Sequence, residues 1–387
     1  MVPREEIDRR LERFRAALRR EGLDGALVVQ EADLFYLSGT AQSAHLVVPV
    51  DDEPGLFVRK SLERARDESP LARVEPLRSL RDMPAALASS GLERGRLGLE
   101  LDVVPAAIYF GYARRLDAFE LADCSTLLRG VRAVKSEWEV ANIRRAAEML
   151  SHVPEWVARH ARVGMTELQL SAELERELRL AGHHGHVRFR GFNQELFYGS
   201  VLAGPSAAVP GATETPIVGP GSTVAVPKGA SQRPIQRGEP IIVDLCGTHE
   251  GYLADQTRTF SLGPLGRGPW REAYARAREV LAGVAADARP GATPSALWER
   301  AASLAAGRER HFMGGVSFVG HGFGLEIDEL PVLAPGFDDP LEPGTVFALE
   351  PKFVFPGYGA VGIENSYVVR EGGVECLTSA PEELIEL

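Results

Sequence analysis

The sequence predicts an α/β (α+β) protein of two domains, residues 1–127 and 128–387. The chain has 387 residues, which exceeds the size at which a single compact core normally stops growing. Helix-type and strand-type patterns alternate up to about residue 116, as in an α/β domain. After about residue 135, a unit of two helices and two strands occurs twice, so the second domain contains an internal repeat.

The first domain is predicted to begin with an amphipathic helix over residues 5–20, which ends near Gly22. Short apolar runs that are typical of buried strands follow at residues 25–29, 45–50, 55–58 and 96–100. These strands carry no cluster of titratable residues. We therefore expect no catalytic residue in this domain.

The helices of the repeat have recognisable start signals. In the first unit, residues 138–160 have a helical pattern, and Thr166 caps the helix that follows. In the second unit, residues 270–287 are helical in pattern, and Thr293 caps the next helix. Because the two units match in order and length, we expect their strands to occupy equivalent places as well.

The strands of the repeat carry acidic residues. Residues 241–260 predict a β-hairpin, with two apolar runs around a polar turn that contains glycine. Alternation along the strands lets Asp244 and Asp255 meet across this hairpin. The strands of the second unit add Glu350 and Glu364. Buried carboxylates a few ångströms apart repel one another, so such a set requires a cation.

His321 lies between the two halves in a glycine-rich segment, where glycines allow close approach of backbone and substrate. If the halves pack about a pseudo-twofold axis, the four carboxylates and this imidazole converge. An oxygen-rich set of this kind suits two divalent ions such as Mn, Co, Zn or Fe, roughly 3.5–4 Å apart. Such a centre generates a hydroxide near neutral pH and polarises a carbonyl, so the sequence predicts a hydrolase.

Composition argues against other classes of protein. The formal net charge of −11 disfavours nucleic acid or an anionic membrane as a partner. No run approaches the roughly 18 apolar residues of a membrane span, and we expect a cytoplasmic protein. The three cysteines, Cys124, Cys246 and Cys376, are too few and too far apart for a disulfide framework or a thiolate zinc site.

The motifs resemble those of the pita-bread metallohydrolases, which include Xaa-Pro aminopeptidases, prolidases and methionine aminopeptidases. The matching segments, in order, are Val243-Asp244 with residues 251–259, residues 320–324, Leu349-Glu350-Pro351 and residues 362–365. Residues 33–39 and the helix before them are similar to the family's creatinase-type N-terminal domain. The resemblance implies a pseudo-twofold pita-bread catalytic domain and a homodimer. It also implies the metal ligands Asp244, Asp255, His321, Glu350 and Glu364, with Glu350 handling the proton of a bridging water.

Three positions depart from the family pattern. The family usually has histidines where this chain has Lys228 and Asp328, and an arginine where it has Gly362. Those histidines normally contact the scissile amide or the tetrahedral intermediate. We therefore expect Lys228 and Asp328 to act in catalysis and, together with Glu329, in substrate binding. The alternative is that Lys228 and Asp328 are solvated surface charges.

Three functions are compatible with this sequence. The first is a dinuclear metal-dependent hydrolase, an Xaa-Pro-type aminopeptidase or dipeptidase that cleaves a short peptide with a metal-bridged hydroxide. The second is a metal-dependent hydrolase or lyase of a small non-peptide substrate such as a small amide, which the replaced histidines favour. The third is a metal-free binding protein, which the five intact ligands disfavour. We expect the first.

Overall fold

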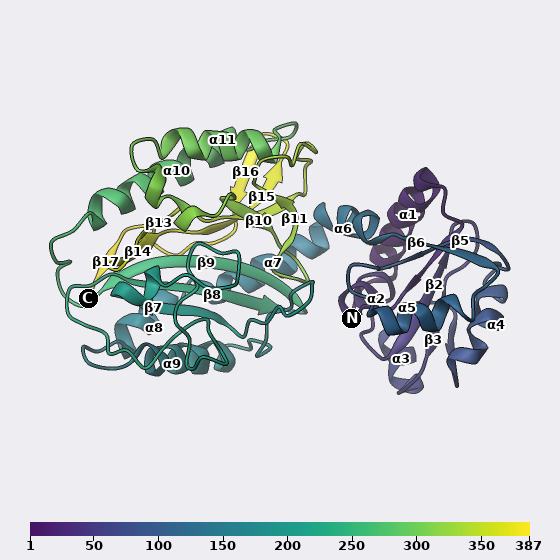
Figure 1. The fold of residues 1–387 in the computed structure, drawn as a ribbon. Helices are drawn as coiled ribbons and strands as arrows, with labels where there is room; N and C mark the ends of the chain where they lie inside the picture. The colour runs from purple at the N-terminus through teal and green to yellow at the C-terminus, as the bar shows by residue number, and fades with distance from the viewer. The chain divides into compact units, whose positions relative to one another are not determined.

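The computed structural model describes residues 1–387, and the chain forms two compact units (Figure 1). The first unit comprises Met1–Arg132 and Arg190–Asn193, and the second comprises Ala133–Phe189 and Gln194–Leu387. The boundary expected at residue 127 lies inside helix α6 (Ser125–Ala133), which continues to the end of the first unit's main segment. No helix in either unit is both long enough and apolar enough to cross a membrane.

The first unit is built on a six-stranded sheet with the strand order β4-β3-β2-β1-β5-β6. The predicted helix and strands of this domain are confirmed to within one residue at each end. The strands are β1 (Gly25–Val28), β2 (Ala44–Pro49), β3 (Gly55–Val58), β4 (Val74–Pro76), β5 (Gly95–Leu99) and β6 (Phe119–Asp123). The helices besides α6 are α1 (Arg4–Glu21), α2 (Glu31–Ser38), α3 (Leu62–Glu68), α4 (Met83–Ala88) and α5 (Ala106–Ala113).

A buried carboxylate explains why the segment Arg190–Asn193 folds with the first unit. Asp33 is fully buried, and its two oxygens accept hydrogen bonds from Arg132 (2.5 Å) and Arg190 (2.7 Å). Arg190 also pairs with Asp102 through two hydrogen bonds. Although burial raises the pKa of Asp33, the two guanidinium groups outweigh it and hold this pKa below its ordinary value. A paired carboxylate of this kind tolerates burial.

The second unit contains three sheets, ordered β17-β9-β8-β7, β11-β10-β12-β15-β16 and β13-β14. Its strands are β7 (Gly199–Ala203), β8 (Ile241–His249), β9 (Tyr252–Ser261), β10 (Gly320–Gly322), β11 (Glu329–Val332), β12 (Val346–Leu349), β13 (Lys352–Phe355), β14 (Gly359–Gly362), β15 (Asn365–Arg370), β16 (Gly373–Cys376) and β17 (Ile385–Glu386). Its helices are α7 (Glu137–Leu150), α8 (Val153–His160), α9 (Glu167–Leu180), α10 (Trp270–Asp287) and α11 (Pro294–Leu304). Within this unit the strands lie between α8 and α9 on one side and α10 and α11 on the other (Figure 1).

The predicted repeat is present, with two differences in detail. Thr166 and Thr293 both cap their helices through their side-chain oxygens, as expected. The long helix expected over residues 138–160 is instead two helices, α7 and α8, because Pro154 lies in the first turn of α8 and cannot donate a backbone hydrogen bond there. Glu364, which was expected on a strand of the second unit, instead lies between two strands, β14 and β15, which belong to different sheets.

The β8–β9 hairpin is fixed in place by close packing against α7. A Cβ atom added at Gly247 on β8 would lie 2.1 Å from the carbonyl oxygen of Ala146 on α7 and 3.1 Å from Leu150 Cγ. The helix backbone therefore lies against the strand at a distance that only glycine allows.

We expect Gly247→Ala to lower the free energy of unfolding by roughly 1–3 kcal/mol, because the added methyl group overpacks the contact between α7 and β8. Urea denaturation followed by circular dichroism measures this change. Gly130→Ala is the control, since Gly130 is an exposed helical residue on α6 with nothing within 4 Å of an added Cβ. It should leave stability unchanged or raise it by about 0.5–1 kcal/mol. Equal effects of the two substitutions would contradict the proposed packing constraint.

Candidate metal centre and active site

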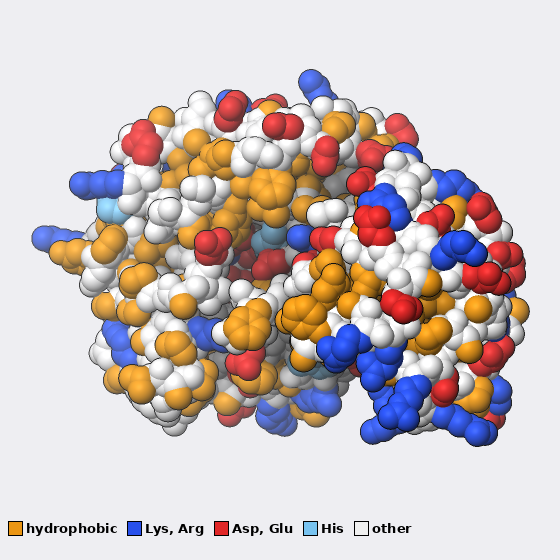
Figure 2. All heavy atoms as spheres, turned by 45° about the vertical axis from the view of Figure 1, so that its right-hand side comes forward, with side chains coloured by type: hydrophobic (Ala, Val, Ile, Leu, Met, Phe, Trp, Pro, Cys, Tyr) orange, Lys and Arg blue, Asp and Glu red, His pale blue; other side chains and the backbone are white.

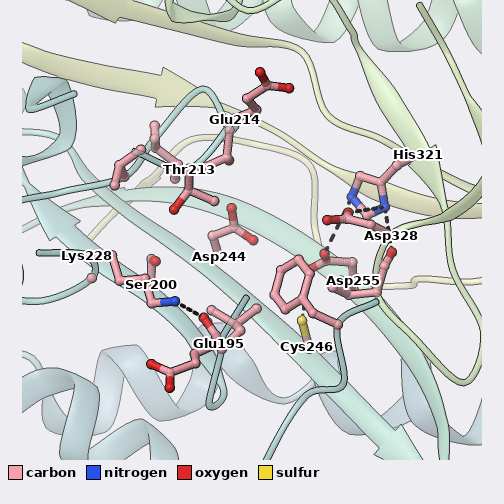
Figure 3. Close-up of a pocket in the computed structure, with 18 of the residues that line it drawn as sticks. Glu195, Ser200, Thr213, Glu214, Lys228, Asp244, Cys246, Asp255, His321 and Asp328 are labelled. Atoms are coloured by element: carbon pink, nitrogen blue, oxygen red, sulfur yellow. Dashed lines mark hydrogen bonds and ion pairs between the residues drawn. The ribbon is translucent and has the colours of Figure 1, made fainter. Parts of the chain in front are cut away.

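The β8–β9 hairpin brings two acidic residues to one pocket, as predicted. Asp244 is opposite Thr257 in the strand register, and Cys246 is opposite Asp255. Since alternate residues of a strand face the same side, all four side chains share one face of the sheet. Asp244, Cys246 and Asp255 line the pocket (Figure 3).

The second half supplies the other expected ligands from strand ends and junctions. His321 is the middle residue of β10, where it pairs with Ala348 of β12. Glu350 directly follows β12, and Glu364 lies in the short junction between β14 and β15. All three side chains are buried and line the same pocket as the hairpin acids. The structure therefore brings all five predicted ligands together.

One subset of these residues has the geometry of an ion site. Ligand atoms of Asp255, His321 and Glu364 all lie within 4.8 Å of one another. His321 Nε2 is 3.9 Å from Asp255 Oδ2 and 3.7 Å from Glu350 Oε1. Its Nδ1 lies 2.9 Å from the carbonyl oxygen of Ile327, to which it donates a hydrogen bond. The lone pair of the neutral ring is then on Nε2, the nitrogen that faces the acids, where it can bind a cation.

Glu364 supplies an independent sign that a cation belongs here. Its Oε1 atom is buried and has no hydrogen-bond partner, whereas its Oε2 accepts hydrogen bonds from Thr257 (2.6 Å) and Lys352 (3.1 Å). A buried carboxylate oxygen without a partner is costly unless a cation binds it. The donor set of Asp255, His321, Glu350 and Glu364 therefore fits a divalent ion.

The electrostatics of Asp255 agree with this fit. Burial, followed by the charges of Glu364 and Asp244, raises the pKa of Asp255 well above its ordinary value. A group in this position favours its neutral form until a positive charge is placed beside it. A bound divalent ion supplies that charge and reverses the effect.

The sequence analysis missed one residue of this centre, Lys352. Its side chain is fully buried at the start of β13. Its Nζ atom lies 2.5 Å from Glu350 Oε2, 3.1 Å from Glu364 Oε2 and 3.3 Å from Asp244 Oδ2. Burial lowers the pKa of Lys352, but these carboxylates outweigh it and raise the pKa well above the ordinary value. The available signal was a lysine two residues after a predicted ligand, within an apolar strand.

The pocket that opens from the centre is small and mixed in character. Its cavity volume is about 160 Å³. Figure 2 shows a hollow with acidic and histidine side chains inside it and hydrophobic side chains around its edge. The apolar lining residues include Phe189, Phe197, Ile217, Val218, Phe318 and Ile327, and the charged ones outside the predicted ligand set are Glu195, Glu214, Lys228 and Asp328.

Lys228 and Asp328 both line this pocket, so neither is a surface charge remote from it. The Lys228 ammonium donates a hydrogen bond to the carbonyl oxygen of Glu195, while Asp328 Oδ1 lies 3.6 Å from His321 Nδ1 (Figure 3). The two residues form no ion pair with each other. Their charges are therefore available separately to a ligand in the pocket.

Glu329 is placed differently from its neighbour. It does not line the pocket, and its carboxylate pairs with Lys135 Nζ at 2.9 Å. The other oxygen accepts hydrogen bonds from the backbone N–H groups of Leu325 (2.8 Å) and Glu326 (3.0 Å). Glu329 therefore braces the loop after His321, and the structure gives it no position from which to touch a ligand.

One of the three cysteines lies at this centre. All three are free thiols, so the chain contains no disulfide. Cys246 is buried beside Asp255, with its Sγ atom 3.7 Å from Asp255 Oδ1. Burial and the neighbouring carboxylates raise the pKa of this thiol well above its ordinary value, so it remains a neutral packing residue.

Comparison with known protein families identifies the catalytic unit. Residues 141–371, more than half of the chain, match the model of metallopeptidase family M24. The chain belongs to metallopeptidase family M24. Residues 10–134 match the creatinase/prolidase N-terminal domain. These matches confirm the creatinase-type first domain and the pita-bread fold of the second, and they show that the chain is an enzyme of the metallopeptidase type.

The matches to relatives of this M24 protein span from about two thirds to nearly all of its length. A probable dipeptidase PepE of Mycobacterium tuberculosis is 28% identical over 390 residues, which span 97% of this chain and 96% of that protein. An Xaa-Pro dipeptidase of Lactobacillus delbrueckii subsp. lactis is 30% identical over 265 residues, or 68% of this chain and 64% of that protein. Among solved structures, an Xaa-Pro dipeptidase from Bacillus anthracis has a TM-score of 0.85 at 25% identity and covers 98% of this chain and 100% of that chain.

We expect Asp255→Asn and His321→Ala each to abolish hydrolysis and to lower Mn²⁺ affinity. Losing a residue that only hydrogen-bonds to a metal ligand typically lowers metal affinity by about 10–100-fold, and losing a ligand itself should lower it further. Each substitution removes one donor from the group whose ligand atoms converge within 4.8 Å. Equilibrium dialysis against Mn²⁺ measures the affinity. His160→Ala, which alters a histidine on α8 paired with Glu177 outside the pocket, should bind as the parent does. Parental Mn²⁺ affinity in Asp255→Asn would refute the assignment of this site.

Proposed function

We propose that this M24 protein is a metal-dependent dipeptidase that hydrolyses short peptides, with Xaa-Pro dipeptides as its substrate class. The observation that carries this proposal is the buried group of Asp255, His321, Glu350 and Glu364 at the base of a cavity of about 160 Å³. A cavity of this size is suited to a small substrate. The dipeptidase descriptions of its relatives support the same reading.

The chain's own residues divide the work of such a reaction. A divalent ion held by these ligands would polarise the scissile carbonyl and lower the pKa of a water molecule. Glu350 has one oxygen, Oε2, bonded to Lys352, while its Oε1 is 3.7 Å from His321 Nε2 on the open side of the centre. That Oε1 atom is therefore the group placed to accept a proton and return it to the leaving amine.

Lys228 and Asp328 suit the two charged ends of a dipeptide. A dipeptide carries an amine at one end and a carboxylate at the other, and Lys228 is the pocket's cation outside the metal centre. Its ammonium donates a hydrogen bond to the carbonyl oxygen of Glu195 and can bind the substrate carboxylate from there. Asp328 is placed to receive the amine. The apolar side chains Phe189, Phe197 and Phe318 offer a surface for a proline ring.

A second candidate function is hydrolysis or lysis of a small non-peptide amide. It is favoured because His321 is the sole histidine that lines the pocket, so no imidazole stands at either position where the family pattern has one. Parallel assays of Xaa-Pro dipeptides and small acylated amines separate the two candidates. Manganese as the native ion, a homodimer and a cytoplasmic location stay predictions.

We expect Lys228→Ala to lower kcat/KM for an Xaa-Pro dipeptide by about 10²–10³, which is typical of losing a positioned charged donor. The same dipeptide with an amidated C-terminus should lose little, because it offers no carboxylate to the ammonium. Steady-state kinetics on the two substrates test this difference. A change of no more than about threefold on both would make Lys228 a bystander.

Under the second candidate function, we expect the double variant Lys228→His with Asp328→His to raise kcat/KM for Xaa-Pro dipeptides at least about tenfold, because a positioned acid–base group contributes about 10²–10⁴. Unlike lysine and aspartate, histidine exchanges protons near neutral pH. Lys60→His with Asp67→His is the matched control, since both positions are exposed in the first unit. The idea fails if the two double variants behave alike.

A further inference from the structure

We infer that Lys352 takes the place of one of the two divalent ions expected at this centre, so that the protein binds a single ion beside a built-in ammonium group. The sequence predicts five ligands for two ions. The structure divides them between one ion site and one lysine. This inference rests on the proposed function only in that the same carboxylates form the catalytic centre.

The ammonium group occupies a site that is itself built from carboxylates. Lys352 Nζ lies 2.5–3.3 Å from one oxygen each of Asp244, Glu350 and Glu364. Asp244 is not part of the group whose ligand atoms converge within 4.8 Å, and its carboxylate lies 3.3 Å from this lysine. A second ion that used Asp244 would have to share these oxygens with a fixed positive charge.

Glu350 and Glu364 connect the two positive positions in the way that bridging ligands do. Glu350 places Oε2 on the ammonium and Oε1 within 3.7 Å of His321 Nε2. Glu364 places Oε2 on the ammonium and leaves Oε1 buried without a hydrogen-bond partner. The second oxygen of Glu364 is therefore left for the remaining ion, and the second oxygen of Glu350 lies beside the histidine of that ion's site.

The fold also reserves space for the lysine side chain. Lys352 and Gly362 are directly opposite each other in the β13–β14 register. A Cβ atom at position 362 would lie 2.5 Å from Lys352 Cγ and 2.9 Å from its Cα. The glycine that replaces the family's arginine is thus what allows the lysine to extend into the centre. The glycine at position 362 and the buried lysine therefore depend on each other.

The ammonium supplies part of the positive charge that the buried acids need. Four carboxylates carry four negative charges, and one divalent ion together with the ammonium supplies three positive ones. Two divalent ions alone supply four, and adding the ammonium to them would give five. Beside the ammonium, one ion leaves a single negative charge unbalanced and two ions leave a single positive one, so the ammonium supplies a charge that would otherwise have to come from a second ion. Lys352 is in this sense a positioning residue, which holds the carboxylates without touching substrate.

Metal stoichiometry tests this inference without reference to turnover. The purified parent is dialysed against Mn²⁺, and the bound metal is measured by mass spectrometry against protein concentration. We expect about one ion per parent chain and about two per chain of Lys352→Ala, because removing the side chain frees the site at Asp244. Electron paramagnetic resonance should show the hyperfine pattern of isolated Mn²⁺ in the parent and a spin-coupled pair in Lys352→Ala.

Further variants control for indirect effects. Adding Asp244→Asn to Lys352→Ala should return the count to about one ion, whereas Asp244→Asn alone should leave the parent's ion in place. Lys352→Arg keeps the positive charge and should keep one ion. Lys135→Ala removes the ammonium of another buried lysine, which pairs with Glu329, and should not alter the count.

Each outcome bears on the inference. Two ions per parent chain, none, or loss of the ion in Asp244→Asn alone would overturn it. If Lys352→Ala does not fold, the parent and Asp244→Asn still decide the question. Two ions with dipeptide hydrolysis would refute the inference and leave the proposed function standing. One ion per chain without hydrolysis of any dipeptide would support the inference and refute the proposed function.

Discussion

Repulsion among buried carboxylates is the constraint on which this catalytic unit depends. Asp244, Asp255, Glu350 and Glu364 face one pocket and are largely withdrawn from water. Such a group is stable only if positive charge is built into it or bound by it. The lysine ammonium supplies one part of that charge from within the chain, and the side with His321 is left for an ion. The chemistry of the centre follows from how the positive charge is divided between the lysine and the ion.

The repeat of two helices and two strands is what makes the convergence possible. The first half presents two acids from the β8–β9 hairpin, and the second half presents two acids from a strand end and a strand junction, so that both pairs face one cavity. The register of β8 against β9 matters most, because a slip of one residue would turn Asp244 and Asp255 to the other face of the sheet. Close contact of α7 with Gly247 holds that hairpin in position. The sheet geometry and the electrostatics are thus specified together.

Local pattern was sufficient to predict much of this. Alternation placed Asp244 and Asp255 on one face, and the resemblance to the pita-bread metallohydrolases implied the full set of five ligands. Local pattern did not reveal the role of Lys352, because that role depends on Asp244, which is distant in sequence, and on packing against Gly362, which has no side chain. Asp328 and Glu329 also show that sequence alone does not predict where a side chain points. The two acids are adjacent in the chain, but Asp328 lines the pocket whereas Glu329 pairs with Lys135.

The segment Arg190–Asn193 gives the two units an interleaved topology rather than a simple tandem order. Cutting the chain after residue 132 would remove Asp33 and Asp102, two carboxylates that bind Arg190. Phe189 immediately precedes this arginine, and Glu195, whose carbonyl holds Lys228, lies just beyond the segment; both residues line the pocket. The catalytic half is therefore not an autonomous module that evolution or an experimenter can detach at one point and expect to keep its substrate-facing wall.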